Sequence, residues 1–389
     1  MLDTPPASVP RTAPLTAPAT RLHLDFLDGV RGLAAFSVVV HHLYTSRMGM
    51  SARSQWPGDL GNSLLYGHLA VGVFLVISGF CLALPVASSR QLARGSLAFY
   101  GKRARRILPP FLMALLGSIA IYWLRHRFAG GDSISAKNVV LNALLLQDVF
   151  PNSNVFNVPL WSVAVEWKIY FLFPAFLWVW RRFGNAALIG VGTLAGAAGT
   201  LLWAEIDSVR TWGHSCPWFL CLFSLGVVAA GLARSETEKA VQWRARLPLT
   251  ALVGAIVVAA LLWQFPVTGR GEFELFVPAL PFIDTAMGVA AAAMMVILAR
   301  APHETSVLKR SLEWRPLVGL GTFAYSLYLT HLPLIRLLNF VLDRAPITRS
   351  SSSLATMVLA VIGVPFLIGA AFVFFVAFER PFLSRRSGT

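Results

Sequence analysis

The chain has 389 residues, of which 56% are hydrophobic and 13% charged, whereas a soluble globular domain is about 25% charged. This composition predicts an integral membrane protein whose constant partner is the lipid bilayer. The net charge of +15 does not indicate nucleic-acid binding, because Lys and Arg fall between the apolar runs and not on one amphipathic face. Cys81, Cys216 and Cys221 are odd in number and lie in apolar segments, so we expect neither a disulfide framework nor a metal site.

Ten apolar runs long enough to cross a bilayer follow one another along the chain. They lie at 27–44, 66–87, 107–125, 160–180, 186–203, 214–233, 247–265, 279–299, 316–340 and 354–378. We therefore predict an all-α polytopic membrane protein with about ten transmembrane helices. Residues 1–23, rich in Pro, Ala and Thr, predict a disordered arm without a signal peptide. The membrane domain is expected over 24–380, and a short tail over 381–389.

The distribution of Lys and Arg between the runs predicts how the chain is oriented. With the N-terminus on the cytoplasmic side, the cytoplasmic connections carry 21 of these residues and the opposite connections carry 9. The positive-inside rule favours that orientation. We therefore expect both termini to be cytoplasmic, in a multi-pass protein of the inner (plasma) membrane of the cell.

The first run carries ionisable groups near both ends, which is costly in a membrane and commonly marks a functional site. Arg31 and His42 are 11 residues apart, so on a helix they return to within about 20° of one face, roughly 16 Å apart along the axis. His41 is turned about 100° away from His42. The alternatives are that Arg31 is only a topological anchor and that the histidine packs or hydrogen-bonds without taking part in chemistry.

A cluster of four cations lies at 102–106, directly before the third run. Arg103 and Arg106 are three residues apart and share a helix face. Planar guanidinium groups bind phosphate through two hydrogen bonds at once, so the pair is a candidate phosphate site. A plain positive-inside signal would explain the same cluster.

Two later runs also carry polar groups. Glu166 and Lys168 lie in the fourth run, two residues apart, and on a helix they point to different faces, so each is expected to have another partner. A structural ion pair with another helix is the alternative role for them. In the ninth run Tyr325, Tyr328 and His331 are spaced by three and form one polar stripe, which could also be packing with locally satisfied hydroxyls. Asp284, in the eighth run, is no more than a guess at a second site.

Taken together, these stretches resemble the acyltransferase family 3 membrane proteins. They are DGVRGLAA at 28–35 followed by His42, ISGF at 77–80, RARRILP at 103–109, PLWS at 159–162 followed by Glu166, YSLYLTHLP at 325–333, and FERPF at 378–382. The motifs occur in the family's order across nearly the whole chain. The chain departs from the family pattern at Ala324, where many members have Ser, and at Trp167-Lys168, where many have Glu-Gln, so Lys168 is left without a role.

The resemblance implies a membrane enzyme that moves an acyl group, expected to be acetyl, from cytoplasmic acyl-coenzyme A to a hydroxyl of a carbohydrate or glycosylated acceptor. Acyl-coenzyme A would be a co-substrate, with no permanently bound cofactor. His42 would be the general base and Glu166 the carboxylate that orients it or balances its charge. Arg31 would act electrostatically on the donor path, and Arg103 and Arg106 would hold the phosphates. The pore would be lined by three further residues, Asp28, Tyr325 and His331.

Several alternatives stay open at this point. His42 could carry the acyl group covalently or only activate the acceptor. A transporter or flippase for a glycolipid or acylated metabolite would also use midmembrane His, Glu and Arg. Some relatives carry a hydrolase-like domain after the last span. Only 11 residues follow Phe378 here, so we expect the membrane domain to do the chemistry. The sequence does not decide between a monomer and a homo-oligomer.

Overall fold

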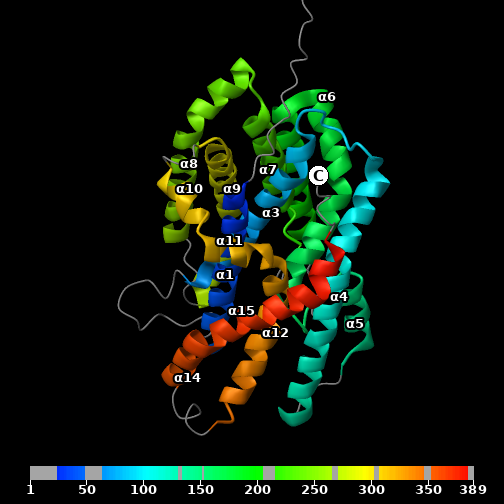
Figure 1. Ribbon diagram of the computed structural model, residues 1–389, viewed down its shortest axis with the longest axis vertical. Helices are drawn as coiled ribbons and strands as arrows, with labels where there is room; N and C mark the ends of the chain where they lie inside the picture. Colours follow the sequence, from blue (N-terminus) through cyan, green and yellow to red (C-terminus); the bar gives the residue numbers. More distant parts are fainter. Residues whose placement is uncertain are drawn as a thin grey trace, which may run out of the picture.

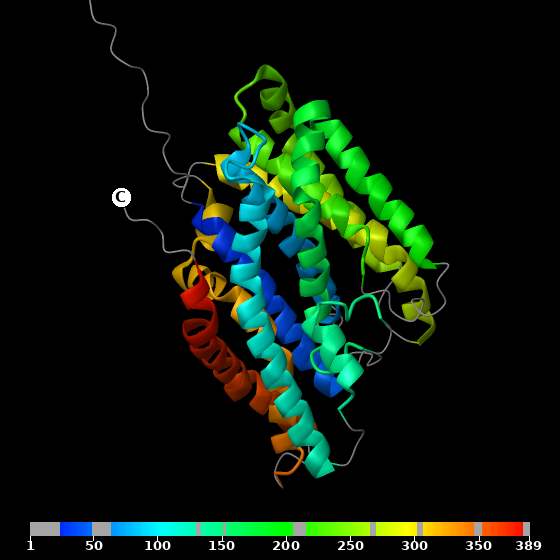
Figure 2. The ribbon, with the colours of Figure 1, turned by 90° about the vertical axis from the view of Figure 1, so that its right-hand side faces the viewer.

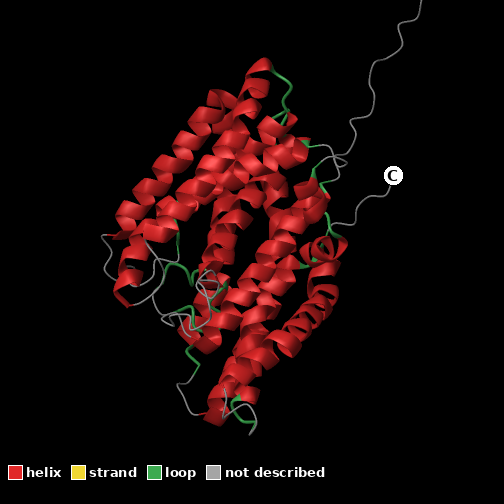
Figure 3. Cartoon of the chain, turned by 90° about the vertical axis from the view of Figure 1, so that its left-hand side faces the viewer, coloured by secondary structure: helices red, strands yellow, loops and turns green. Residues whose placement is uncertain are grey.

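The computed structural model describes residues 24–48, 64–129, 134–150, 153–204, 215–264, 270–301, 306–345 and 352–383. Every regular element in these ranges is helical (Figure 3), so the all-α prediction is confirmed. The main helices are α1 (Asp25–Met48), α3 (Gly67–Ala83), α4 (Gly95–Ala129), α5 (Ala136–Ala143), α6 (Leu160–Ala204), α7 (Phe219–Arg234), α8 (Glu238–Gln264), α9 (Arg270–Arg300), α10 (Val307–Leu312), α11 (Arg315–Thr322), α12 (Ala324–Leu342), α14 (Ser352–Val358) and α15 (Val364–Phe374). The expected arm, 1–23, and the end of the tail, 384–389, lie outside the described residues.

Each of the ten expected runs falls on a helix, but the count of ten spans is not confirmed. By length and apolar composition, six helices within the described ranges could cross a membrane, or seven if one bent pair is a single span. That pair is α11 and α12, which meet at an angle of 77°. The fourth and fifth runs form one long helix, α6, whose two arms meet at Gly184 with a φ of 85°. A break of this kind suits glycine, which lacks the Cβ that disfavours positive φ.

Helix α1 runs through the middle of the bundle, with α3 on one side and α11 and α12 on the other (Figures 1 and 2). Glycines set its distance from α10 and α11. A Cβ added at Gly29 would lie 1.7 Å from the Leu312 carbonyl oxygen, and one at Gly321 would lie 1.8 Å from the Asp28 carbonyl oxygen. Small residues permit such close helix crossings in membranes. The glycines of the first motif therefore bring Asp28 and Arg31 up to the start of the ninth-run helices.

A second close crossing joins α3 to α7. A Cβ at Gly79 would lie 2.3 Å from the Phe223 carbonyl oxygen, and one at Gly226 would lie 2.1 Å from the Val76 carbonyl oxygen. The two residues of the Ser78-Gly79 pair have different roles. Gly79 is a packing residue, whereas the Ser78 side chain turns toward α6 and bonds to Tyr170, 2.7 Å away.

The segment between α4 and α6 folds back against α6, through α5 and the turn after it. Lys168 of α6 donates from Nζ to the Leu145 carbonyl, 2.9 Å away, and to Asp148 Oδ1, 2.5 Å away. Gln147 donates to the Leu160 carbonyl at 2.9 Å. Asp148 is buried. The structure therefore gives Lys168 a structural partner, and these bonds hold the segment against the start of α6.

Candidate functional site

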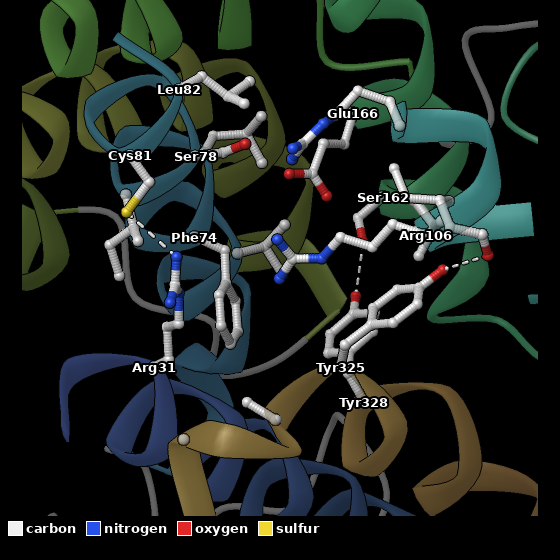
Figure 4. Close-up of a pocket in the computed structure, with 18 of the residues that line it drawn as sticks. Arg31, Phe74, Ser78, Cys81, Leu82, Arg106, Ser162, Glu166, Tyr325 and Tyr328 are labelled. Atoms are coloured by element: carbon white, nitrogen blue, oxygen red, sulfur yellow. Dashed lines mark hydrogen bonds between the residues drawn. The ribbon is translucent and has the colours of Figure 1, made fainter. Parts of the chain in front are cut away.

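A cavity of about 460 Å³ lies between α1, α3, α4, α6 and α12, and many polar side chains line it. We call it the arginine pocket. Its polar lining comprises Asp28, Arg31, Ser78, Cys81, Arg103, Arg106, Ser162, Glu166, Tyr170, Thr322, Tyr325, Tyr328 and Glu379. Figure 4 shows Arg31, Arg106 and Glu166 pointing into this space from three different helices. Residues separated by more than 100 positions in the sequence thus meet in one place.

On α1, Arg31 is held in the pocket wall by two neighbours. Its Nη1 donates to Asp28 Oδ1 at 2.7 Å, one turn earlier in the same helix. Its Nη2 donates to Cys81 Sγ of α3 at 3.1 Å. Asp28 therefore orients and partly neutralises Arg31, which explains why the first motif carries an acid and a base three residues apart.

Helix α4 supplies two more guanidinium groups, Arg103 and Arg106. Arg103 lies over the Phe99 ring, 5.8 Å from its centroid, and its Nε is buried without a hydrogen-bond partner. Within the described part of the chain, neither arginine forms an ion pair. Arg106 and its neighbour Arg105 are both exposed, but Arg105 does not line the cavity. The spacing of three found in the sequence therefore does select the two cluster members that face the pocket.

On α6, Glu166 accepts a short hydrogen bond from the hydroxyl of Tyr170, one turn later. Tyr170 in turn bonds to Ser78 of α3 at 2.7 Å. Sequence analysis placed Glu166 beside His42 as its orienting carboxylate. In this structure no hydrogen bond between described residues joins Glu166 to His42, and the partner of Glu166 is Tyr170. Glu166 belongs to the pocket wall.

The start of α12 closes the pocket with two tyrosines. Tyr325 donates to the Ile107 carbonyl of α4 at 3.2 Å. Tyr328 lies 2.7 Å from Ser162 Oγ and 3.0 Å from the Pro159 carbonyl oxygen. These bonds satisfy both hydroxyls locally, the packing role that the sequence left open, and both residues also line the cavity.

His42 and His331 form a contact beyond the pocket, and neither lines it. His331 Nε2 lies 3.3 Å from His42 Nδ1. His42 Nδ1 also lies 3.0 Å from the Val38 carbonyl oxygen, and His331 Nδ1 lies 2.8 Å from the Tyr328 carbonyl oxygen. Carbonyl oxygens only accept, so Nδ1 carries the proton in both neutral rings. This leaves His42 Nε2 with its lone pair, as a base requires.

Tyr328 connects the histidine pair to the pocket. It lines the cavity, and its ring centroid is 5.7 Å from that of His331. His41 points elsewhere, as the helical spacing predicted, and its Nδ1 lies 2.8 Å from the Leu64 carbonyl oxygen. The structure thus brings together two parts of the predicted site, the pocket and the histidine pair, with Tyr328 between them.

Sequence analysis missed several polar residues of this region. Tyr170 lies four residues after Glu166, a spacing that predicts contact on a helix, so it could have been found. Glu379, of the π-helical turn η4 (Phe375–Glu379), is buried, and its Oε2 accepts from the Ser326 amide at 3.2 Å. Its partner is 53 positions away, and no local pattern indicates the contact. His68 was also missed, and Asp284, no more than a guess from sequence, is its partner.

Comparison with known proteins places these motifs in a family. A family model described as an acyltransferase domain matches residues 24–378. Peptidoglycan O-acetyltransferase OatA of Listeria monocytogenes is 23% identical over 342 residues, which cover 83% of this chain and 51% of that protein. Acyltransferase MdmB of Streptomyces mycarofaciens is 26% identical over 344 residues, 82% of this chain and 81% of that protein. O-acetyltransferase OatA of Staphylococcus aureus is 24% identical over 333 residues, 82% of this chain and 51% of that protein.

The chain spans about half the length of the two OatA proteins it matches. No solved structure matches it. The family match nevertheless covers nearly all of the described residues and every motif discussed above except the last, FERPF at 378–382, of which it reaches only Phe378. The chain therefore belongs to the acyltransferase family that its motifs resemble.

Proposed function

We propose that this protein is a membrane O-acyltransferase that moves an acyl group, most simply acetyl, from cytoplasmic acyl-coenzyme A to a hydroxyl of a carbohydrate. The relatives support the class of reaction. Two are named O-acetyltransferases, and one of them is named for peptidoglycan, a carbohydrate polymer. None of the three relatives described above is named as a transporter, so the flippase alternative has no support from them.

One observation carries the donor assignment: Arg103 and Arg106 face the cavity without an ion-pair partner among the described residues. Glu166 and Glu379 line the same cavity, but neither forms an ion pair with these two arginines, whose donors stay available for an anion. Coenzyme A carries several phosphates, and guanidinium groups bind phosphate with charge-assisted, two-pronged geometry. A transporter for a neutral glycolipid has no need of such a pair.

In the proposed reaction His42 Nε2 accepts the proton of the acceptor hydroxyl as its oxygen attacks the thioester carbonyl. Arg31 stabilises negative charge on the donor in the pocket. Glu166 lies in the pocket wall, where it accepts the hydrogen bond of Tyr170. Arg31 and His42 lie roughly 16 Å apart along α1. The extended pantetheine arm of coenzyme A spans that depth, so a cytoplasmic donor reaches an acceptor deep in the bilayer.

The test is to measure acetyl-coenzyme A binding to the purified full chain, and then transfer of radiolabelled acetyl groups to the envelope carbohydrates of the source organism. We expect saturable binding that requires Arg103 and Arg106, and labelled O-acetyl groups that alkali removes. A wild-type chain that binds no acyl-coenzyme A, or that transfers no label, would overturn the proposal.

The sidedness of the reaction can be tested separately. Single cysteines at 88–98 or 234–246 should be shielded from an impermeant thiol reagent in intact cells. Cysteines at 50–60 and 268–276, segments outside the described residues apart from 270–276 of α9, should react. Labelling of 234–246 from outside would reverse the predicted orientation and with it the cytoplasmic donor side.

A further inference from the structure

A second histidine centre lies close to the arginine pocket, on α3 and α9. His68 Nε2 is 2.8 Å from Asp284 Oδ2, and Trp218 Nε1 donates to the same oxygen at 2.8 Å. The His68 ring stacks on Trp161, with centroids 5.7 Å apart and planes 9° apart. Among the described residues this is the only carboxylate–histidine ion pair. The ring of His68 is therefore fixed from its edge and from one face.

The charge balance of this pair is set by the burial of its carboxylate. Asp284 is fully buried, and its Oδ1 has no hydrogen-bond partner in the part of the chain that the structure describes. The basic group that bonds it there is His68. A buried carboxylate without a counter-charge is strongly unfavourable, so the pair is held most stably with the proton on His68. The side chain of His68 keeps 23% of its surface exposed, so one side of the ring stays open.

The pair adjoins the pocket from two directions. His68 lies one turn before Val71 on α3, and Val71 lines the cavity. Trp161, which stacks on His68, is followed by Ser162, which also lines the cavity. The pocket is thus bordered at this end by the His42–His331 contact and by His68–Asp284.

The two centres also adjoin each other through His41. The His41 ring lies against Gly67, where an added Cβ would be 2.4 Å from His41 Cγ, and Gly67 precedes His68. On its other side the His41 ring is 4.8 Å from that of His42. The two centres therefore flank the same end of the donor cavity.

Their environments favour opposite protonation states. His42 Nδ1 is bonded to a carbonyl oxygen and lies near another imidazole, with no carboxylate among its hydrogen-bond partners, an arrangement that suits the neutral ring. His68 faces a buried carboxylate, an arrangement that suits the imidazolium. Pairs of titratable groups whose surroundings separate their protonation in this way identify the base and the acid of a reaction.

We propose that His68 is the general acid of the acyl transfer, held in place and kept protonated by Asp284. This inference rests on the proposed function. The acceptor oxygen forms a bond to the acyl carbon and loses its proton to His42, and the carbon–sulfur bond of the thioester breaks. The leaving thiolate takes the proton of His68, so coenzyme A departs as the thiol. The proton held by His42 then restores His68 through solvent, and no proton is gained or lost overall.

The experiment compares two acetyl donors whose leaving groups differ in their need for a proton. Acetyl-coenzyme A releases coenzyme A as a basic thiolate, whereas S-(4-nitrophenyl) thioacetate releases 4-nitrothiophenolate, a weakly basic thiolate that leaves without proton assistance. The full-length chain is assayed in membranes with radiolabelled donors and the envelope carbohydrate as acceptor. We expect His68→Gln to lose about 10²–10⁴-fold in rate with acetyl-coenzyme A and less than about threefold with the activated donor.

Matched variants isolate the effect. Gln at position 68 still hydrogen-bonds Asp284, so the buried carboxylate keeps a partner. Asp284→Asn keeps an acceptor for His68 and Trp218 but removes the charge, and it should show a smaller loss with the same dependence on the donor. His126→Gln is the control, because His126 contacts Tyr122 near the end of α4 and lies outside both centres. It should match the wild type with both donors.

Two outcomes would overturn the inference while leaving the proposed function intact. One is equal loss with both donors, which indicates a structural role for the pair. The other is full activity of His68→Gln with acetyl-coenzyme A. By contrast, a wild-type chain that transfers no acetyl group from acetyl-coenzyme A contradicts the proposed function itself, whatever the variants do.

Discussion

The arginine pocket and the histidine centres lie side by side, yet their charges are balanced in different ways. In the pocket, Arg31 has Asp28 as a partner, while Arg103 and Arg106 have no ion-pair partner among the described residues. At the histidine end, each imidazole is bonded to a backbone carbonyl, another histidine or one buried carboxylate. Guanidinium groups that have no ion-pair partner suit the binding of an anion, whereas imidazoles held by hydrogen bonds suit the transfer of protons. The groups proposed for donor binding and those proposed for proton transfer therefore occupy adjacent but different places in the bundle.

The largest expected effect tests the chemical end. His42→Ala should lower acetyl transfer about 10²–10⁴-fold, because it removes the proposed base, while acetyl-coenzyme A still binds. Transfer and binding are measured on the same preparation after protein levels are matched. His41→Ala is the paired control and should keep most activity, since its ring bonds the Leu64 carbonyl and not His331. An inactive, well-expressed His41→Ala protein would reverse the assignment of the two histidines.

The next effect tests the binding end. Arg103→Ala and Arg106→Ala should each weaken acetyl-coenzyme A binding by about 1.5–3 kcal/mol, roughly 10–150-fold, because each loses a charge-assisted contact. Binding is measured by titration calorimetry on the purified protein. Arg105→Ala removes the same charge from the same helix but from an exposed side chain outside the cavity, and it should change affinity little. Equal losses at all three positions would favour a plain positive-inside cluster.

A smaller effect tests whether Glu166 acts in the arginine pocket or together with His42. Glu166→Gln should lower transfer roughly 3–10-fold, since the amide keeps part of the hydrogen bond to Tyr170 but not the charge. Combined with Tyr170→Phe it should show a coupling energy of about 0.5–3 kcal/mol, because both changes remove the same bond. The rates of both single variants and the double variant give this energy. If Glu166→Gln couples strongly to His42→Ala instead, Glu166 acts as the partner of His42, as sequence analysis expected.

The smallest effect concerns arginines that are already paired. Glu236 bonds Arg300 at 2.5 Å and Arg244 at 3.2 Å, and the hydrogen bond from Arg300 holds the pKa of Glu236 below its usual range. The carboxylate therefore stays charged, and the contact stays formed, throughout assays at pH 5–8; it is lost only as the pH falls through the lowered pKa. Arg300→Ala should change acetyl-coenzyme A affinity less than about twofold. A large change in the same titration would show that cation number, and not the pocket, governs binding.

Much of the pocket could be predicted because its residues repeat at helical spacing. Asp28 and Arg31 are three apart, as are Arg103 and Arg106, and in each case the structure places both members on the cavity. The number of spans could not be obtained in this way. Length and hydropathy do not reveal that α6 continues past Gly184 or that α11 and α12 meet at 77°. Both features depend on how neighbouring helices pack.

The sequence by itself determined the class of the protein, its apolar runs, its family and the helix faces that carry the arginines, because these follow from composition and from periodicity within one helix. Only the tertiary structure decided the partners. Glu166 bonds Tyr170 and not His42, and His331 meets His42 from 289 positions away. His68 meets Asp284 across 216 positions. Such contacts depend on close helix crossings, as at Gly79 and Gly226. Three-dimensional packing decides which distant side chains a crossing brings together, and no periodic pattern in the sequence indicates them.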